Sequence, residues 1–204
     1  MITYKLILLG DTAVGKTSIV TRYVYKKYNE NQNSTIGASF LSYQIDNLYK
    51  INVWDSAGQE RYKTLVSCYY RDTNIALIVF DINNIKIDNI LYWLNDFRYK
   101  CNNIHSKIIL VGNKYDNLQV DNEILSQNNS SDIDINLELK KIIKEYNLEY
   151  FKISAKNNYN IDNLFNHIAI YIKTLQPSIN SSTINLENKY KTTKNYLTDY
   201  CCFR

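Results

Sequence analysis

The sequence is poor in glycine, proline and cysteine, and it lacks long apolar runs. Its 204 residues include 5 glycines, 1 proline and 4 cysteines. No apolar stretch approaches the roughly 20 residues that a membrane-spanning helix requires. The apolar stretch near the start, Tyr4 to Leu9, is too short for a signal peptide and runs into a glycine. We therefore expect a cytosolic protein, or one attached to a membrane by other means than a spanning helix.

The sequence also lacks a metal-binding or disulfide pattern and a block of basic residues. The cysteine spacing fits neither a zinc site nor a disulfide framework, and we expect Cys68 and Cys101 to be buried or half-buried thiols. The two histidines, His105 and His167, stand alone and are interpreted as ordinary residues. The net charge of +4 is mild and gives little reason to expect a nucleic-acid partner.

Short apolar runs alternate with segments of helical spacing. Strands are expected over residues 5–9, 40–48, 49–54, 75–80, 108–111 and 150–153, and helices over 16–25, 87–98, 137–146 and 161–175. This alternation predicts an α/β domain with a mostly parallel sheet. Residues 117–136 lack periodicity and are predicted to form a surface loop. We expect a folded domain over residues 1–176 and a flexible tail over residues 177–204.

The segment Gly10 to Thr17 matches the pattern G-x-x-x-x-G-K-[ST] and lies between a predicted strand and a predicted helix. Glycines let the backbone curl so that successive N–H groups face phosphate oxygens, and the positive end of the helix adds to this attraction. The Lys16 ammonium is expected near the β- and γ-phosphates, and the Thr17 hydroxyl on Mg²⁺. The other residues expected at the phosphates are Asp11, Thr12, Ala13, Val14, Gly15 and Ser18.

A second pair of motifs favours guanine over adenine. The Asp116 carboxylate, in an N-K-x-D pattern after an apolar strand, can accept hydrogen bonds from guanine N1–H and the 2-amino group. Adenine offers no matching pair of donors, and a site built on buried hydrogen bonds rejects such a mismatch strongly. A Ser-Ala-Lys segment follows the next strand, where a backbone N–H can meet guanine O6. The residues expected around the base are Asn113, Lys114, Asp116, Ser154, Ala155 and Lys156.

The chain resembles a Ras-type small GTPase over residues 1 to about 175. The segment 55–60, Asp-Ser-Ala-Gly-Gln-Glu, resembles the family's D-x-x-G-Q motif. Thr35 has the family's spacing from the phosphate loop, and Tyr28 occupies the position of an aromatic residue that lies against the base and ribose. The resemblance implies a three-layer P-loop GTPase domain, with a six-stranded, mostly parallel sheet flanked by about five helices.

The same resemblance implies a mechanism. The Thr17 and Thr35 hydroxyls and the two terminal phosphates would hold Mg²⁺, with Asp55 behind bound water as the third metal-site residue. Gln59 would orient the attacking water, with Lys16 and Thr35 as further catalytic residues. Thr35 and the N–H of Gly58 would sense the γ-phosphate, so that both switch loops relax after hydrolysis. We find no arginine finger within the chain, and we therefore expect slow intrinsic hydrolysis that a partner's arginine accelerates.

Several stretches resemble the Rab branch, among them residues 36–40, 52–65, 69–71 and 77–81. In that branch an aromatic trio corresponding to Phe40, Trp54 and Tyr69 forms an effector surface; the alternative is that all three belong to the sheet core. Residues 35–40 are most similar to the early-endosomal subgroup. The resemblance implies control of vesicle traffic at the cytoplasmic face of endomembranes, with early endosomes as the expected compartment.

The C-terminal residues Cys201 and Cys202 resemble a double prenylation signal, and two lipid chains make stable membrane anchoring possible. The alternative is an ordinary chain end with two reactive thiols. The partners implied are a guanine nucleotide exchange factor, a GTPase-activating protein, effectors, a Rab escort protein and a GDP-dissociation inhibitor. We expect a monomer.

Four features depart from the family's pattern. Ser56 replaces a common threonine, Asp72 stands where Rabs often have glycine, and Thr12 is bulkier than the glycine of Ras itself. The loop over residues 117–136 is about ten residues longer than usual, and we favour neutral expansion over a new binding site there.

Three other functions are alternatives to a Rab-type GTPase. A nucleotide-binding scaffold that hardly hydrolyses GTP would not need Gln59 and Thr35. A nucleotide kinase would need a second substrate pocket and an arginine-rich lid. A member of the same family outside the Rab branch would be prenylated without Rab escort machinery.

Overall fold

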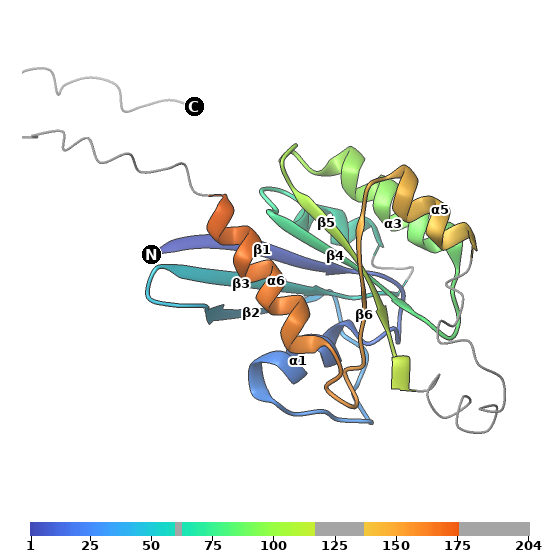
Figure 1. Ribbon diagram of the computed structural model, residues 1–204, viewed down its shortest axis with the longest axis horizontal. Helices are drawn as coiled ribbons and strands as arrows, with labels where there is room; N and C mark the ends of the chain where they lie inside the picture. Colours follow the sequence, from blue (N-terminus) through green and yellow to red (C-terminus); the bar gives the residue numbers. More distant parts are fainter. Residues whose placement is uncertain (60–62, 117–136, 176–204) are drawn as a thin grey trace, which may run out of the picture. The chain divides into compact units, whose positions relative to one another are not determined.

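The computed structural model describes residues 1–59, 63–116 and 137–175, and its first 174 residues form one compact unit, Met1–Thr174 (Figure 1). The strands are β1 (Ile2–Leu9), β2 (Ala38–Gln44), β3 (Tyr49–Ser56), β4 (Ile75–Asp81), β5 (Lys107–Asn113) and β6 (Glu149–Lys152). The helices are α1 (Lys16–Tyr25), α2 (Lys63–Val66), α3 (Ile87–Lys100), α5 (Leu137–Glu145) and α6 (Ile161–Thr174), and a 3₁₀ turn, η2 (Ser67–Tyr69), follows α2.

The six strands form one sheet in the order β2-β3-β1-β4-β5-β6. Strand β2 pairs antiparallel with β3, and every other pair is parallel. Strand β4 is apolar and buried along nearly its whole length, as a central parallel strand covered on both faces should be. The expected six-stranded, mostly parallel α/β fold is confirmed. Its parallel strands end at a common edge, where ligands bind in such sheets.

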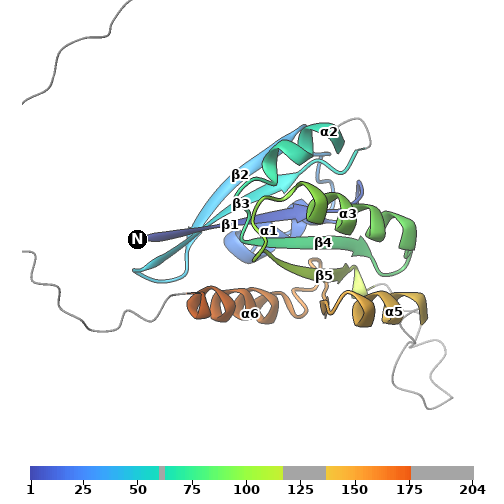
Figure 2. The same ribbon diagram turned by 90° about the horizontal axis from the view of Figure 1, so that it is seen from above.

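Helices cover both faces of the sheet, and Figures 1 and 2 both show α6 well apart from α3. Helix α6 packs with α1, where Phe165 stacks on Tyr23 with ring centroids 3.8 Å apart. On the other face, α3 and α5 share one apolar cluster, to which Trp93 and Leu139 contribute fully buried side chains. The two helical layers leave the carboxyl edge of the sheet free for the loops that follow β1, β3, β5 and β6.

The predicted elements differ from the observed ones mainly at the hairpin between β2 and β3. A strand was expected to continue to Leu48, but β2 ends at Gln44. The chain turns there because the Asp46 carboxylate accepts the N–H groups of Leu48 at 2.9 Å and Tyr49 at 3.1 Å. A side chain that bonds its own backbone two residues on favours a turn over a ladder.

The short helices α2 and η2 were not predicted, since segments of a few residues have no measurable period. Cys68, which lies in η2, was expected to be buried or half-buried; it is exposed, so that prediction is wrong, whereas Cys101 is half-buried as expected. None of the helices described is long and apolar enough to cross a membrane. The predicted loop (117–136) and tail (177–204) lie outside the described residues, and the division at residue 176 stays a prediction.

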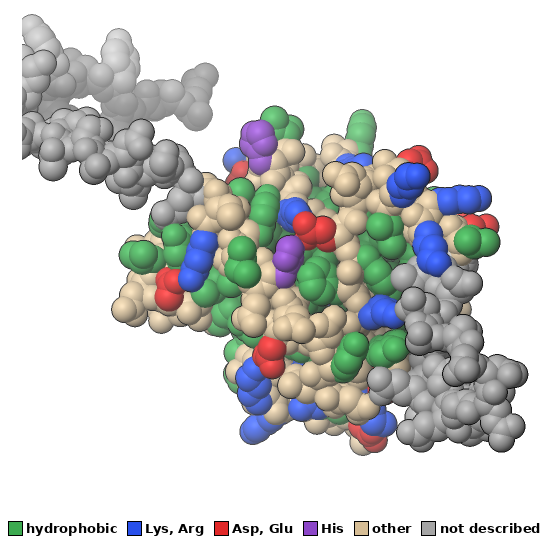
Figure 3. Space-filling view, in the orientation of Figure 1, with side chains coloured by type: hydrophobic (Ala, Val, Ile, Leu, Met, Phe, Trp, Pro, Cys, Tyr) green, Lys and Arg blue, Asp and Glu red, His purple; other side chains and the backbone are tan. Residues whose placement is uncertain are grey.

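The face drawn in Figure 3 carries basic and acidic side chains interspersed among apolar ones. A cluster of such side chains lies at β5, β6 and α6, where Glu149 pairs with Lys107 and contacts His167 Nε2. These contacts lower the pKa of Glu149 against the opposing effect of burial. The His167 side chain therefore contacts a carboxylate at the surface, in keeping with its interpretation as an ordinary residue.

Candidate functional site

A pocket of about 340 Å³ opens at the carboxyl edge of the sheet. Its lining comes from five separate parts of the chain. They are the phosphate loop with the start of α1, the segment before β2, the end of β3, the loop after β5 and the loop after β6. The lining residues are Thr12, Ala13, Gly15, Lys16, Thr17, Ser18, Tyr28, Asn29, Glu30, Gln32, Asn33, Ser34, Thr35, Ser56, Gly58, Asn113, Lys114, Asp116, Ala155 and Lys156. Most of the residues predicted to bind the nucleotide thus meet in one cavity.

The phosphate loop curves because three of its residues adopt positive φ angles. Gly10 has φ 138°, Ala13 has φ 61° and Gly15 has φ 94°. Helix α1 begins at Lys16, and its first residues line the pocket, so the positive end of the helix faces the cavity. The loop therefore presents backbone N–H groups and a helix N-terminus together, the combination that binds phosphate.

The ammonium of Lys16 is buried against the loop it belongs to. Nζ donates to the carbonyl oxygens of Gly10 and Asp11, both at 2.8 Å. Burial lowers the pKa of Lys16 to about 8, and the carboxylates of Asp55 and Asp11 oppose that shift. A phosphate group in the pocket would add opposite charge beside this ammonium and favour its charged form.

Oxygen atoms from three segments meet beside Lys16. The Thr17 hydroxyl donates to Asp55 Oδ2 at 2.7 Å and lies 3.0 Å from the Thr35 hydroxyl oxygen. Burial raises the pKa of Asp55, although its hydrogen bonds with Thr17 and Ser39 act in the other direction. Its second oxygen, Oδ1, is buried and has no hydrogen-bond partner among the residues described.

This oxygen set fits Mg²⁺. Hydroxyl and carboxylate oxygens are the ligands that hard divalent cations take, with water and phosphate oxygens completing the shell. A cation nearby would supply the charge that the unpartnered Asp55 Oδ1 lacks and would favour the ionised carboxylate. Thr17, Thr35 and Asp55 are therefore the residues that would hold the metal.

Asn113 connects the phosphate loop to the loop that follows β6. Its side-chain N–H₂ donates to the Val14 carbonyl at 2.9 Å, and its Oδ1 accepts the Ala155 N–H at 3.1 Å. Asn113 is 2% exposed, so both bonds are shielded from water. A backbone N–H of the Ser-Ala-Lys segment was expected to meet guanine O6; of these, the Ala155 N–H is donated to Asn113 in this structure.

The carboxylate of Asp116 is held at the rim of the pocket. Ser154, which is fully buried, donates its hydroxyl to Asp116 Oδ1 at 2.5 Å and accepts the Asn157 N–H at 3.0 Å. Ser154 does not itself line the pocket, and it positions Asp116 from behind. Lys114 has φ 65°, and its ammonium pairs with Asp81, at the end of β4, at 2.9 Å.

The sequence interpretation missed Arg22 and Glu30. Arg22, on α1, donates to the carbonyls of Ala155 at 2.7 Å and Lys156 at 2.6 Å, and its guanidinium lies 5.5 Å from the centre of the Tyr28 ring. Glu30 pairs with Lys156 at 2.8 Å across the mouth of the pocket. No local pattern marks these residues, because their partners are far away in the sequence.

Besides Ser154 and Asp55, three further predicted nucleotide-site residues do not line the pocket. Asp11 and Val14 do not line the pocket with their side chains; Val14 is buried, and the Asp11 carboxylate is bonded to Asn89 and Trp93 on α3. Gln59 is half-buried next to Gly58 and is not among the lining residues. The roles assigned to individual residues remain predictions.

The three rings of the expected aromatic trio contact one another in a row across β2, β3 and η2. Phe40 meets Trp54 edge to face at 5.3 Å, and Trp54 stacks on Tyr69 at 5.0 Å. Phe40 is 55% exposed, while the other two rings are half-buried and pack against the core. Membership in the plain sheet core is therefore excluded for Phe40. Lys5 lies behind the stack, with Nζ 5.1 Å from the centre of the Trp54 ring.

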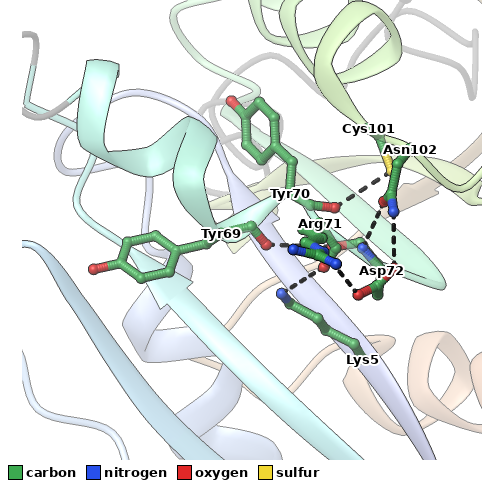
Figure 4. Close-up of polar contacts among 8 residues, drawn as sticks. Lys5, Tyr69, Tyr70, Arg71, Asp72, Cys101 and Asn102 are labelled. Carbon is green, nitrogen blue, oxygen red and sulfur yellow. Dashed lines mark hydrogen bonds and ion pairs between the residues drawn. The ribbon is translucent and has the colours of Figure 1, made fainter. Parts of the chain in front are cut away.

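The segment that follows Tyr69 is tied to the loop after α3 (Figure 4). Lys5 Nζ donates to the Arg71 carbonyl at 2.7 Å, and Asp72 exchanges two hydrogen bonds with Asn102 at 2.7 and 2.9 Å. Asp72 has φ 56°, a left-handed angle that aspartate tolerates better than most residues. The glycine that Rabs often have at this position is thus replaced by a residue that meets the same backbone requirement.

Asp72→Ala is expected to lower the free energy of unfolding by about 1 kcal/mol. Alanine in the left-handed conformation is strained and has no side-chain group that can form a local hydrogen bond to offset the strain. The exposed Arg71–Asp72 pair, with N and O 3.4 Å apart, should contribute little. Denaturant unfolding at fixed nucleotide concentration measures the change. Asp72→Asn should match the original chain, and Asp72→Gly should fall within about 0.5 kcal/mol of it. Equal losses in the alanine and glycine variants would contradict the strain argument.

Comparison with known proteins shows the family to which this chain belongs. The model of the Ras family matches residues 5–174. The chain is also 35% identical over 209 residues to Ras-related protein Rab-1 from Theileria annulata, with 97% of this chain and 89% of that protein covered. Both matches span the whole set of loops that form the pocket.

Proposed function

Since this chain belongs to the Ras family and is a Rab-like small GTPase, we propose that it acts as a GTP-dependent switch that recruits effectors in vesicle traffic. As a member of that family it binds GTP or GDP with Mg²⁺ and hydrolyses GTP. The observation that carries the proposal is the contact among Thr17, Thr35 and Asp55, which joins the phosphate loop, the segment before β2 and the end of β3 at one point.

In this proposal the chain's own residues bind and orient the nucleotide. The phosphate loop and Lys16 hold the phosphates, and Asp116, positioned by Ser154, reads the base edge. Mg²⁺, when bound, neutralises developing charge on the phosphates. Thr35 and Gly58 lie on different segments that line the same pocket, so both can change position when the γ-phosphate leaves.

Gln59→Leu is expected to slow single-turnover GTP hydrolysis at least about tenfold while nucleotide affinity is retained, because leucine cannot orient the attacking water. Phosphate release from preloaded protein measures the rate. Gln44→Leu, an exposed position on β2, is the matched control and should leave the rate unchanged. An unaltered rate in the Gln59 variant would remove Gln59 from the mechanism and would favour another source of water orientation.

The finer assignments are supported by sequence alone. The early-endosomal compartment rests on residues 35–40, and the relative named Rab-1 gives no support for that subgroup. Lipid attachment rests on Cys201 and Cys202, which lie outside the described residues. Mass spectrometry of protein isolated from a eukaryotic host should reveal two prenyl groups on the terminal peptide, and an unmodified peptide would contradict the proposed anchor.

A further inference from the structure

Asp11, the second residue of the phosphate loop, directs its carboxylate to α3. The indole N–H of Trp93 donates to Asp11 Oδ1 at 3.0 Å, and the side-chain amide of Asn89 donates to Oδ2. Trp93 is 1% exposed, and an indole N–H is a donor that has no acceptor capacity of its own. Helix α3 therefore binds both oxygens of the Asp11 carboxylate. Without these two bonds, the carboxylate could turn toward the negatively charged phosphates of the nucleotide.

The backbone of Asp11 contacts two further parts of the site. Its carbonyl oxygen accepts the Lys16 ammonium at 2.8 Å. A Cβ added to Gly58 would lie 2.3 Å from the Asp11 carbonyl carbon and 2.4 Å from the Thr12 nitrogen, so the Gly58 backbone lies directly against the Asp11–Thr12 peptide. Asp11 thus touches the phosphate-binding lysine, the segment after β3 and α3 at the same time.

We propose that Asp11 is a positioning residue: Trp93 and Asn89 hold its carboxylate, and the peptide held in this way sets where Lys16 and Gly58 lie. The inference rests on the proposed function, because its consequence is a coupling between the bound nucleotide and α3. Because the Gly58 backbone lies against the Asp11–Thr12 peptide, a change in the position of Gly58 changes the position of that peptide. That peptide is linked through the Asp11 side chain to the buried Trp93.

GDP release is the first measurement. Asp11→Ala should release GDP about tenfold faster, which corresponds to about 1.4 kcal/mol and matches the loss of a hydrogen-bond partner for buried donors. Asp11→Asn should release GDP at nearly the original rate, since its amide oxygen can accept the indole N–H and Asn89 can rotate to accept in return. Asp88→Ala is the matched control, because Asp88 is an exposed carboxylate on the same helix.

Trp93 fluorescence is the second measurement, and it tests the coupling itself. The chain has 2 tryptophans, so Trp54→Phe leaves Trp93 as the single emitter. In that background the emission of protein loaded with GDP should differ from that of protein loaded with a non-hydrolysable GTP analogue. The difference should disappear with Asp11→Ala and persist with Asp11→Asn, whereas a residue that only stabilises the fold would not separate these two variants.

A third variant covers the case in which Asp11→Ala fails to fold. Trp93→Phe keeps a buried ring and removes the donor, and it should accelerate GDP release by a similar factor. In the double variant the acceleration should not exceed that of Asp11→Ala alone, since that change already removes the bond that Trp93→Phe removes. Multiplying effects in the double variant, or GDP release at the original rate in Asp11→Ala, would overturn the proposal. An original chain that bound neither GDP nor GTP would instead contradict the proposed function, before any variant is compared.

Discussion

Asp116→Asn is expected to change the preference of the pocket from guanine to xanthine nucleotides by about 10³-fold. Each hydrogen bond from a base donor to a carboxylate contributes about 2 kcal/mol, and two of them account for a factor of this size. Asparagine offers an N–H₂ group that pairs with the 2-oxo group of xanthine instead. The Ser154 hydroxyl, which donates to Asp116 Oδ1 at 2.5 Å, can donate equally to an amide oxygen, so the residue should stay in place.

Competition binding of GDP and XDP to nucleotide-stripped protein measures this change. Asp81→Asn is the control, because Asp81 pairs with neighbouring Lys114 at 2.9 Å and does not line the pocket. That variant should weaken both nucleotides alike and leave their ratio unchanged. An Asp116 variant that still preferred GDP would show that the base is read elsewhere.

Gly15→Ala is expected to weaken GDP binding at least about 100-fold. Gly15 has φ 94°, and a Cβ there would lie 2.3 Å from Asn113 Nδ2. Asn113 would have to move, and it would lose the bonds by which it joins the Val14 carbonyl to the Ala155 N–H. Two lost hydrogen bonds at about 1 kcal/mol each and backbone strain of about 1–2 kcal/mol together give the expected factor.

The effect of backbone strain at Gly15 can be separated from the effect of the contact between the added Cβ and Asn113 by comparison with a second glycine of this chain. Gly37 also has a left-handed angle, φ 70°, but a Cβ added there would meet no atom within 4 Å. Gly37→Ala should therefore lower the melting temperature slightly without disturbing Asn113. Calorimetric titration with GDP, together with thermal unfolding, compares the two variants. If both lost the same affinity, the displacement of Asn113 would not be the cause.

The fold was predictable because its elements are marked locally. Apolar strands such as Ile75–Asp81 are short runs with clear ends, and Lys16–Tyr25 begins at the residue where the phosphate motif predicted a helix. The site was also largely predictable, because its motifs follow strands whose carboxyl ends lie at one edge of a parallel sheet. Convergence in one pocket then follows from topology.

What could not be predicted depends on side-chain direction and distant partners. The phosphate motif places the backbone of Asp11 at the nucleotide, yet only the folded structure brings Trp93 from α3 against its carboxylate. Arg22 bonds to carbonyls more than a hundred positions away, and no spacing in the sequence indicates that choice. Cys68 lies exposed on η2, and this element is too short to leave a periodic pattern in the sequence from which the exposure could be predicted.

The two hydrogen bonds of the Asn113 side chain have a consequence for the lifetime of the folded protein. Because one buried side chain ties the phosphate loop to the loop after β6, the parts that hold the nucleotide are also parts that hold the fold together. A ligand present at a thousand times its dissociation constant stabilises the folded state by about 4 kcal/mol. Cellular GDP and GTP would then stabilise the folded protein as well as set its signalling state. A chain that lost its nucleotide would unfold more often and would be degraded by proteases.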